Sequence, residues 1–233
     1  MWADGSFRLP YYLTDMKILL IVVLIAMSFW LYRRHQHDYQ KTKQARLRLL
    51  DEVTALFDGV VVEQSGLEFP QLKGFYKGFE VKLNLVEDSL AVRKIPPLWL
   101  MMTVQGKQRI DGSLDMIVRP QNNEFYSPAW QWEGNLQAPA HWPQHSIIKF
   151  QDAPADVKLI DDLVPSLFED AHAKELLITP WSVRLTYMAK QAERGEYLIM
   201  RNTVFNAEPL AKEVVMKVLN DAITIRVALE KGN

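Results

Sequence analysis

An apolar run near the N-terminus constrains this chain more than any other feature. Residues 18–32 carry no charge, and Ser28 is their one strongly polar side chain. A helix that is apolar all round its axis is either buried in a protein core or surrounded by lipid. As a helix the run would extend about 22 Å, short of the roughly 30 Å hydrocarbon layer of a bilayer, so flanking residues have to complete a span.

Aromatic and cationic side chains border the run as they do in membrane-spanning helices. Leu13 and Met16 extend the apolar surface by one turn, and the stem of Lys17 is long enough to carry its amine to the headgroups. Tyrosine and tryptophan concentrate at the same depth in membrane proteins. We therefore predict a single-pass transmembrane helix over residues 16–32, a short extracytoplasmic N-terminus over residues 1–15, and a membrane interface formed by Tyr11, Tyr12, Lys17, Trp30, Tyr32, Arg33 and Arg34.

Two other interpretations of the run are weaker. A cleaved signal peptide ends in small residues, whereas the bulky residues 29–32 close this run. A buried core helix is disfavoured because the run lies at the end of the chain beside a basic segment. Translation could begin at Met1 or at Met16, and either start leaves the predicted orientation unchanged.

The basic residues around the run are distributed unevenly. Arg8 and Lys17 precede it, whereas six Lys and Arg residues lie between positions 33 and 48. Lys and Arg are enriched on the cytoplasmic side of membrane helices. The predicted location is therefore the cell inner membrane, with the N-terminus outside and the large C-terminal part in the cytoplasm.

The segment after the run reads as a continuation of the same helix. Residues 33–58 contain no proline or glycine and are rich in good helix formers, so we predict a basic juxtamembrane helix that stops at Gly59. Within residues 33–50, six basic side chains stand against one acidic side chain, Asp38. Contact with anionic lipid would explain this excess, and so would a topology signal alone.

The rest of the chain, residues 59–233, has the length of a single domain. In residues 79–86 apolar and polar side chains alternate, which is typical of an antiparallel strand with one exposed face. The Lys77-Gly78 turn would join this strand to residues 72–76 in a hairpin. We predict an α+β fold, in which an antiparallel sheet is followed by a long C-terminal helix over residues 208–230. Further strands are expected at residues 60–62, 98–105, 113–119, 147–150, 176–179, 183–188 and 197–201.

The two halves of this domain show a loose symmetry. Each half places a strand pair around a glycine turn, at Gly78 in the first half and at Gly195 in the second. A further helix is expected over residues 156–170, which Pro165 would kink or split. The pattern allows a two-fold internal pseudo-repeat.

An aromatic and proline-rich stretch over residues 125–145 lacks any periodicity. Its large rings would either pack on the domain as a lid or stand out as a contact for a protein or a lipid surface, since such rings anchor interfaces. The candidate partner-contact residues are Phe125, Tyr126, Trp130, Trp132 and Trp142.

The sequence carries no recognisable catalytic motif. Without cysteine there is no disulfide, no thiol nucleophile and no Cys-ligated metal, and a formal net charge of −1 argues against a nucleic-acid binder. His141 and His145 have a helical ligand spacing, but neighbouring prolines disfavour a helix there. The acidic doublets at 161–162 and 169–170 fit a solvated helix surface better than a carboxylate dyad. We expect no cofactor and no metal ion, and an enzyme is the weaker hypothesis.

The order of elements resembles that of small bacterial single-pass membrane-anchored domains of unknown function. The resemblance rests on the span, the basic linker, the turn at residues 74–78 and the late strands followed by a helix. Our first hypothesis is a non-catalytic membrane-anchored interaction module, an accessory or scaffold subunit of a larger inner-membrane complex of the respiratory or photosynthetic type. Its partners would be the lipid bilayer, including anionic lipid, and other subunits of the membrane complex. The alternative is a membrane-bound enzyme or small-ligand sensor with a pocket beneath the 125–145 loop.

Overall fold

The computed structural model of the chain describes residues 11–90, 94–108, 110–121, 124–153 and 157–231, with the backbone alone for residues 11–14 and 231. The chain divides into two compact units, Met1–Gln44 and Ala45–Asn233. Each unit is described by itself.

The first unit is built on the helix α1, Tyr11–Arg48. Its large apolar side chains from Met16 to Tyr32 are between 48% and 64% exposed, so none of the described residues covers them. The helix is long and apolar enough to cross a membrane. The alternative of a buried core helix is wrong for this run, because burial of its apolar side chains is what defines such a helix.

Helix α1 ends at Arg48, ten residues earlier than predicted. Turns and the short 3-10 helix η1, Thr54–Leu56, lead from there to the first strand. Leu49, Leu50, Val53 and Phe57 are all buried in the core of the second unit. Spaced i, i+1, i+4 and i+8, these positions would also share one face of a straight helix, so the apolar pattern fits a helix and the observed turns alike. The prediction of helix up to residue 58 is wrong because the chain turns after Arg48, although the composition of the segment favours a helix.

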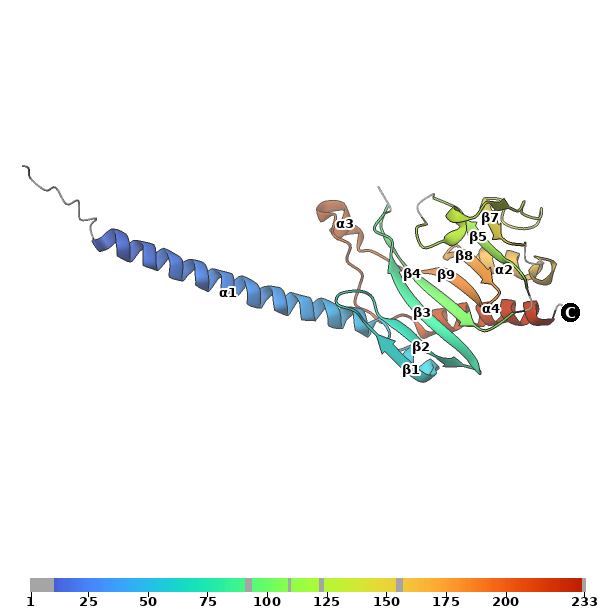
Figure 1. The fold of residues 1–233 in the computed structure, drawn as a ribbon, viewed down its shortest axis with the longest axis horizontal. Coiled ribbons are helices and arrows are strands. Elements are labelled where there is room, and N and C mark those ends of the chain that lie inside the picture. The colour runs from blue at the N-terminus through green and yellow to red at the C-terminus, as the bar shows by residue number, and fades with distance from the viewer. Residues whose placement is uncertain (1–10, 91–93, 109, 122–123, 154–156, 232–233) are drawn as a thin grey trace, which may run out of the picture. The chain divides into compact units, whose positions relative to one another are not determined.

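The second unit confirms the predicted α+β fold (Figure 1). Its described residues form a nine-stranded sheet in the order β1-β2-β3-β4-β9-β8-β5-β7-β6, with antiparallel pairing throughout. The strands are β1 (Asp58–Glu63), β2 (Gln71–Tyr76), β3 (Phe79–Glu87), β4 (Pro97–Gln105), β5 (Ser113–Val118), β6 (Gly134–Asn135), β7 (Ser146–Gln151), β8 (Ala173–Thr179) and β9 (Ser182–Gln191).

The predicted hairpin at Lys77-Gly78 is present. Both turn residues have positive φ angles, 50° and 83°, as a two-residue turn between twisted antiparallel strands requires. In β3, Val81, Leu83 and Leu85 are buried in the core, and the polar residues between them lie on the opposite face. The alternation of the sequence thus assigns one face of this strand to the core.

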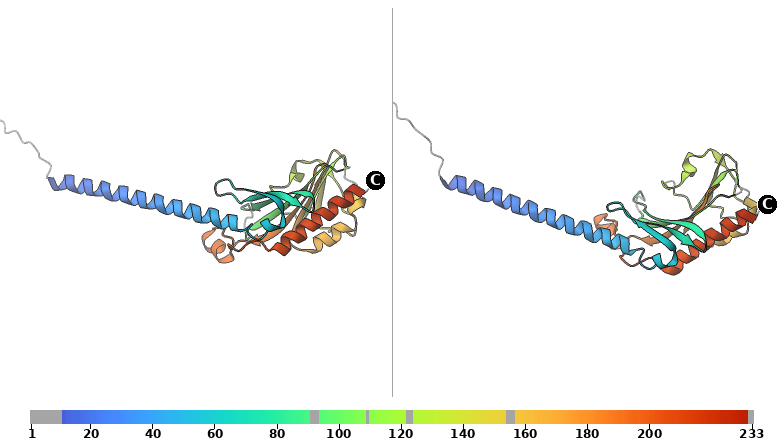
Figure 2. Two further views of the ribbon diagram at one scale, coloured as in Figure 1. Left: turned by 90° about the horizontal axis from the view of Figure 1, so that it is seen from below. Right: turned by 60° about the horizontal axis from the view of Figure 1, so that its bottom comes forward.

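Helix α4, Lys212–Lys231, covers one face of the sheet, with the shorter α2, Leu163–Glu169, beside it (Figure 2). Its buried side chains pack on the apolar side chains of β4 and β9. The helix starts at Lys212 rather than at residue 208, because residues 208–211 are not helical and the amide of Leu210 donates to the carbonyl of Leu49 instead. The α4 residues in the core are Val215, Val218, Leu219, Ala222, Ile225 and Leu229.

Two predictions in the second half of the domain need correction. Residues 197–201 are not a strand, because α3, Arg194–Met200, is a short helix that contains Gly195. The sheet neighbours of β9 are β4 and β8, and β8 is joined to it through Pro180 and Trp181. The strand pair expected around Gly195 is therefore absent. The helix expected over residues 156–170 is split into the 3-10 helix η3, Val157–Ile160, and α2, which holds Pro165 in its first turn, where no backbone donor is needed.

Candidate functional site

The sheet face opposite α4 carries a cluster of charged side chains. The alternation of β5, β8 and β9 places Asp115, Glu175, Arg184 and Thr186 on this face, between residues that point into the core. Arg184 donates to both carboxylate oxygens of Glu175 at 3.1 Å, and the hydroxyl of Thr186 donates to the same carboxylate. Asp115 and Glu175 are both fully buried. Burial of this kind is costly unless each charge is paired or neutralised.

Residues 124–132, the capping loop, cover this cluster. The hydroxyl of Ser127 donates to Asp115 Oδ2 at 2.5 Å, and the amide of Ala129 donates to the same oxygen at 3.3 Å. Arg184 reaches the loop from below, donating to the carbonyl of Tyr126 at 3.2 Å. The same Ser127 hydroxyl accepts from the amide of Ala129 and so caps the 3-10 helix η2, Pro128–Gln131.

A second buried ion pair anchors the start of the capping loop. Glu124 and Lys174 are almost completely buried and lie 2.7 Å apart. Lys174 also donates to the carbonyls of Val118 and Arg119, at 3.1 and 2.7 Å. The indole of Trp130 donates to the Glu124 carbonyl at 2.9 Å. The loop is therefore fixed to the sheet by hydrogen bonds along its length.

Burial and neighbouring charges set the protonation of this cluster. Burial raises the pKa of Asp115 to about 8, and the nearby Glu175 carboxylate adds to the effect, against opposing contributions from Ser127 and Arg184. Burial also raises the pKa of Glu175, although Arg184 opposes it. For Glu124 burial acts in the same direction, but its bonds to Lys174 and to the Gln121 amide outweigh it and lower the pKa. At neutral pH Asp115 is thus largely protonated, which removes its repulsion with Glu175.

The five aromatic residues singled out in the sequence occupy different environments. Trp142 is buried in the core, and its indole donates to Asp161 Oδ1 at 2.9 Å. Tyr126 is partly buried, with its ring centroid 5.9 Å from that of Trp99 and 5.6 Å from that of Phe125. Phe125 and Trp130 are 50% and 43% exposed. The apolar surface that the capping loop exposes therefore consists mainly of Phe125 and Trp130.

Trp132 lies at the edge of a hollow beside the loop. The hollow has a volume of about 420 Å³ and is lined by residues 131–134 and 150–152. Under the loop itself, Ser127 and Ala129 lie directly on Asp115. The hollow and the buried charges are thus separate features.

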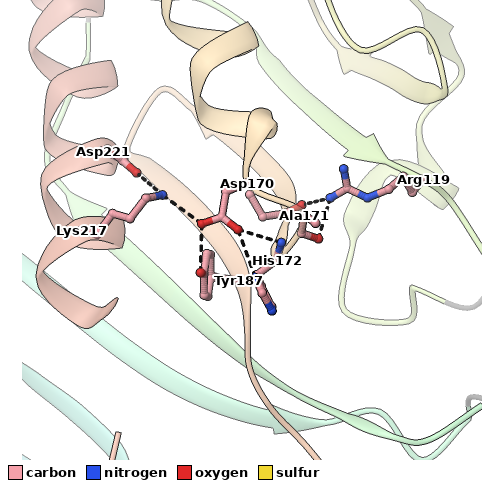
Figure 3. A network of polar contacts seen from close by, with 8 residues as sticks. Arg119, Asp170, Ala171, His172, Tyr187, Lys217 and Asp221 are labelled. Carbon is pink, nitrogen blue, oxygen red and sulfur yellow. Dashed lines mark hydrogen bonds and ion pairs between the residues drawn. The ribbon is translucent and has the colours of Figure 1, made fainter. Parts of the chain in front are cut away.

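A second polar network lies around Asp170, at the end of α2 (Figure 3). Asp170 accepts hydrogen bonds from the His172 amide at 3.0 Å and the Tyr187 hydroxyl at 3.0 Å, and pairs with Lys217 at 3.3 Å. These bonds outweigh the effect of burial and lower the pKa of Asp170 to about 2. Burial, together with Asp170, raises the pKa of Tyr187 to about 12. The network joins α2, β8, β9 and α4, and we interpret it as a structural clamp.

The acidic doublets and the histidines of the sequence take part in local contacts. Asp161 Oδ1 lies 2.8 Å from His141 Nε2, and Asp170 lies beside His172. Across the described residues, no three or more His, Cys, Asp or Glu side chains are grouped so that they could hold a metal ion.

The predicted membrane-interface residues fall on α1. Cations lie over aromatic rings one turn before them, with Arg33 5.9 Å from the Phe29 ring and Arg34 5.6 Å from the Trp30 ring. Trp30 and Tyr32 are exposed, as is Lys17. The side chains of Tyr11 and Tyr12 lie outside the described part of the chain.

The sequence patterns did not identify the buried charged residues as a site. Asp115, Glu175 and Arg184 each interrupt an apolar strand, and that interruption is the signal that could have identified them. Their proximity depends on the strand order β9-β8-β5, which joins segments far apart in the chain.

Comparison with known proteins identifies no family. No family model matches the chain, and no curated protein matches it. The crystal structure of the mycobacterial trehalose monomycolate transport factor A, TtfA, is similar over 76% of this chain and 77% of that chain, with 9% sequence identity and a TM-score of 0.43. A similarity of this degree carries no argument about function.

Proposed function

We propose that this chain is a non-catalytic, membrane-anchored interaction module, an accessory or scaffold subunit of a larger inner-membrane complex. Helix α1 supplies the anchor and the capping loop supplies the contact with a partner subunit. The observation that carries the proposal is the exposure of Phe125 and Trp130 on a loop that buried charges hold in place.

The rigidity of the capping loop favours binding. Interfaces gain most of their affinity from a few aromatic or arginine side chains that enter pockets on the partner. Ordering a flexible loop on binding would oppose that gain, and this loop is already ordered by its bonds to Asp115 and Lys174. We expect the partner to offer an apolar pocket for the two rings.

The membrane part of the proposal concerns orientation and lipid. The basic residues between positions 33 and 48 support an N-terminus outside and a cytoplasmic C-terminal unit, with anionic lipid near the basic segment. A fluorescent protein and alkaline phosphatase, each fused after Asn233, test the orientation. Fluorescence without phosphatase activity is expected, and the reverse result would contradict it.

A matched pair of variants tests the partner contact. The full chain is purified in mild detergent from native membranes as wild type, as Phe125→Ala/Trp130→Ala and as Trp181→Ala, whose ring is 62% exposed on the β8–β9 turn. We expect proteins that co-purify with the wild type and with Trp181→Ala to be lost from the double variant. Its melting temperature should fall only slightly, because the bond of Trp130 to the Glu124 carbonyl is lost while those of Ser127, Ala129 and Lys174 remain. Equal recovery with all three would count against the loop.

The hollow beside Trp132 supports the alternative, an enzyme or a small-ligand sensor. A ligand seated there would raise the melting temperature of the wild type and of Phe125→Ala, and would do so less for Trp132→Ala. A thermal-shift screen of metabolite mixtures on these three proteins distinguishes the alternative from the first proposal.

A further inference from the structure

A second exposed apolar feature lies at the tip of a short lobe, residues 193–204. The lobe is closed at its base by the Glu193 amide, which donates to the carbonyl of Val204 at 2.7 Å. Helix α3 forms its tip and ends at Met200, followed by the C-cap Arg201, whose φ angle is 54°. The lobe is thus a defined structure that projects from the end of β9.

The apolar side chains of this tip point outward. Leu198, Ile199 and Met200 are 54%, 81% and 72% exposed. Ile199 is more exposed than any large apolar side chain of the α1 run, where the highest value is 64%. Single exposed apolar residues are ordinary, but three in succession on a helix tip mark a contact surface.

The lobe lies at the end of the domain where the chain enters it. From Val204 the chain continues to Phe205, whose ring lies 5.9 Å from that of Phe69, and to Leu210, which is bonded to Leu49. The guanidinium of Arg46 lies 4.2 Å from the Phe69 ring. Figures 1 and 2 show α3 at the opposite end of this unit from the C-terminus of α4.

We propose that the tip of α3 is a second membrane contact, which inserts Leu198, Ile199 and Met200 into the surface of the same bilayer that α1 crosses. The proposal rests on the proposed function in that α1 must span the membrane. Arg194 and Arg201 flank the apolar residues, and Arg201 lies 5.5 Å from the Tyr197 ring. Arginine and tyrosine beside an apolar tip are typical of segments at the lipid interface.

The charges of the lobe indicate the kind of lipid surface. Glu193 and Glu196 balance Arg194 and Arg201, so the lobe has no net charge. Its binding should therefore come from apolar insertion and should persist on zwitterionic lipid and in high salt.

The tether between span and domain allows the contact. Residues 33–44 extend about 18 Å as a helix, and single membrane helices tilt by up to about 40°. A protein surface is the other occupant that an apolar tip could take, and the experiment separates the two.

The absence of cysteine permits a direct test in the full chain. Single-cysteine variants Leu24→Cys, Ile199→Cys and Trp181→Cys are labelled with an environment-sensitive fluorophore and reconstituted into phosphatidylcholine vesicles, with and without doxyl-labelled phosphatidylcholine. Position 24 reports the span and position 181 is the exposed control remote from the lobe. All three side chains are exposed in the protein itself, so labelling should not disturb folding.

We expect doxyl lipid to quench the labels at positions 24 and 199, with blue-shifted emission at both, while iodide quenches the label at position 181. Quenching by doxyl lipid at 24 without quenching at 199 would overturn the α3 contact and leave the anchor intact. A label at 199 that is shielded from iodide but not quenched by lipid would show protein on the tip and would also overturn it. Loss of lipid quenching at position 24 would contradict the proposed function itself.

Discussion

The two faces of the sheet are stabilised in different ways. The face under α4 is filled by apolar side chains such as Leu100, Met102 and Leu219, each of which gains from burial independently of its particular neighbour. The opposite face buries charges that are tolerated only as a set, because Glu175 needs Arg184. Apolar packing is therefore additive to a first approximation, whereas the charged face should show strong coupling between residues.

The largest effect is expected from removing one partner of the buried ion pair between Glu175 and Arg184. Arg184→Met leaves Glu175 buried beside Asp115 without its cation, and the free energy of unfolding should fall by about 3–5 kcal/mol in urea denaturation. The double variant Glu175→Leu/Arg184→Met should recover most of this loss. A double variant less stable than Arg184→Met would show that the two charges are not coupled.

Truncation of a side chain on the apolar face should lower the free energy of unfolding slightly less, and no second substitution should restore it. Leu219→Ala removes a fully buried side chain of α4 and should lower the free energy of unfolding by about 2–5 kcal/mol. The exposed Thr224→Ala on the same helix is the matched control and should change stability little. Combination of Leu219→Ala with Arg184→Met should give additive losses.

The protonation of Asp115 gives the charged face a pH dependence. Its pKa in the folded protein, about 8, lies above the ordinary value of 3.8, so its contribution to stability is full below about pH 4 and is lost as the pH rises through 8. Asp115→Asn should therefore melt near the wild-type temperature at pH 4.5 and above it at pH 8. A difference that is the same at both pH values would contradict the assignment of the proton.

The smallest effect is expected at the Asp170 clamp, and its dependence on pH has the opposite sign to that of Asp115. The pKa of Asp170 is lowered to about 2 from 3.8, so its stabilisation is present above pH 4 and is lost as the pH falls through 2. Asp170→Asn should lower the free energy of unfolding at pH 7 by about 1 kcal/mol or less, since its ion pair with Lys217 is partly exposed. Thermal melts at pH 7 and pH 2.5 should show the difference shrinking at the lower pH.

The sequence predicted the elements that depend on neighbours in the chain and failed where the structure depends on distant contacts. Alternation in residues 79–86 and the Lys77-Gly78 turn depend on neighbours in the chain, so the hairpin and the core face of β3 were predicted correctly. The end of α1 was wrong because the apolar spacing of Leu49 and Phe57 fits a helix as well as the turns that the chain makes after Arg48. Residues 197–201 were taken for a strand because they are apolar, yet they pair with no sheet edge and form the exposed helix α3.

The candidate site was predicted only in its local part. Phe125 and Trp130 of the aromatic stretch are exposed on a loop, and their exposure depends on bonds that the loop makes with β5 and β8. Their role as partner contacts stays a prediction. Those bonds join residues more than ten positions apart through a strand order that no local pattern specifies.

Extraction of native membranes with alkaline carbonate tests the central claim most directly. If α1 crosses the bilayer and the chain works as a membrane-anchored module, the full-length protein stays in the pellet, and detergent is needed to release it. Recovery of the intact chain in the aqueous supernatant would contradict the account, because every function proposed for it begins from that anchor.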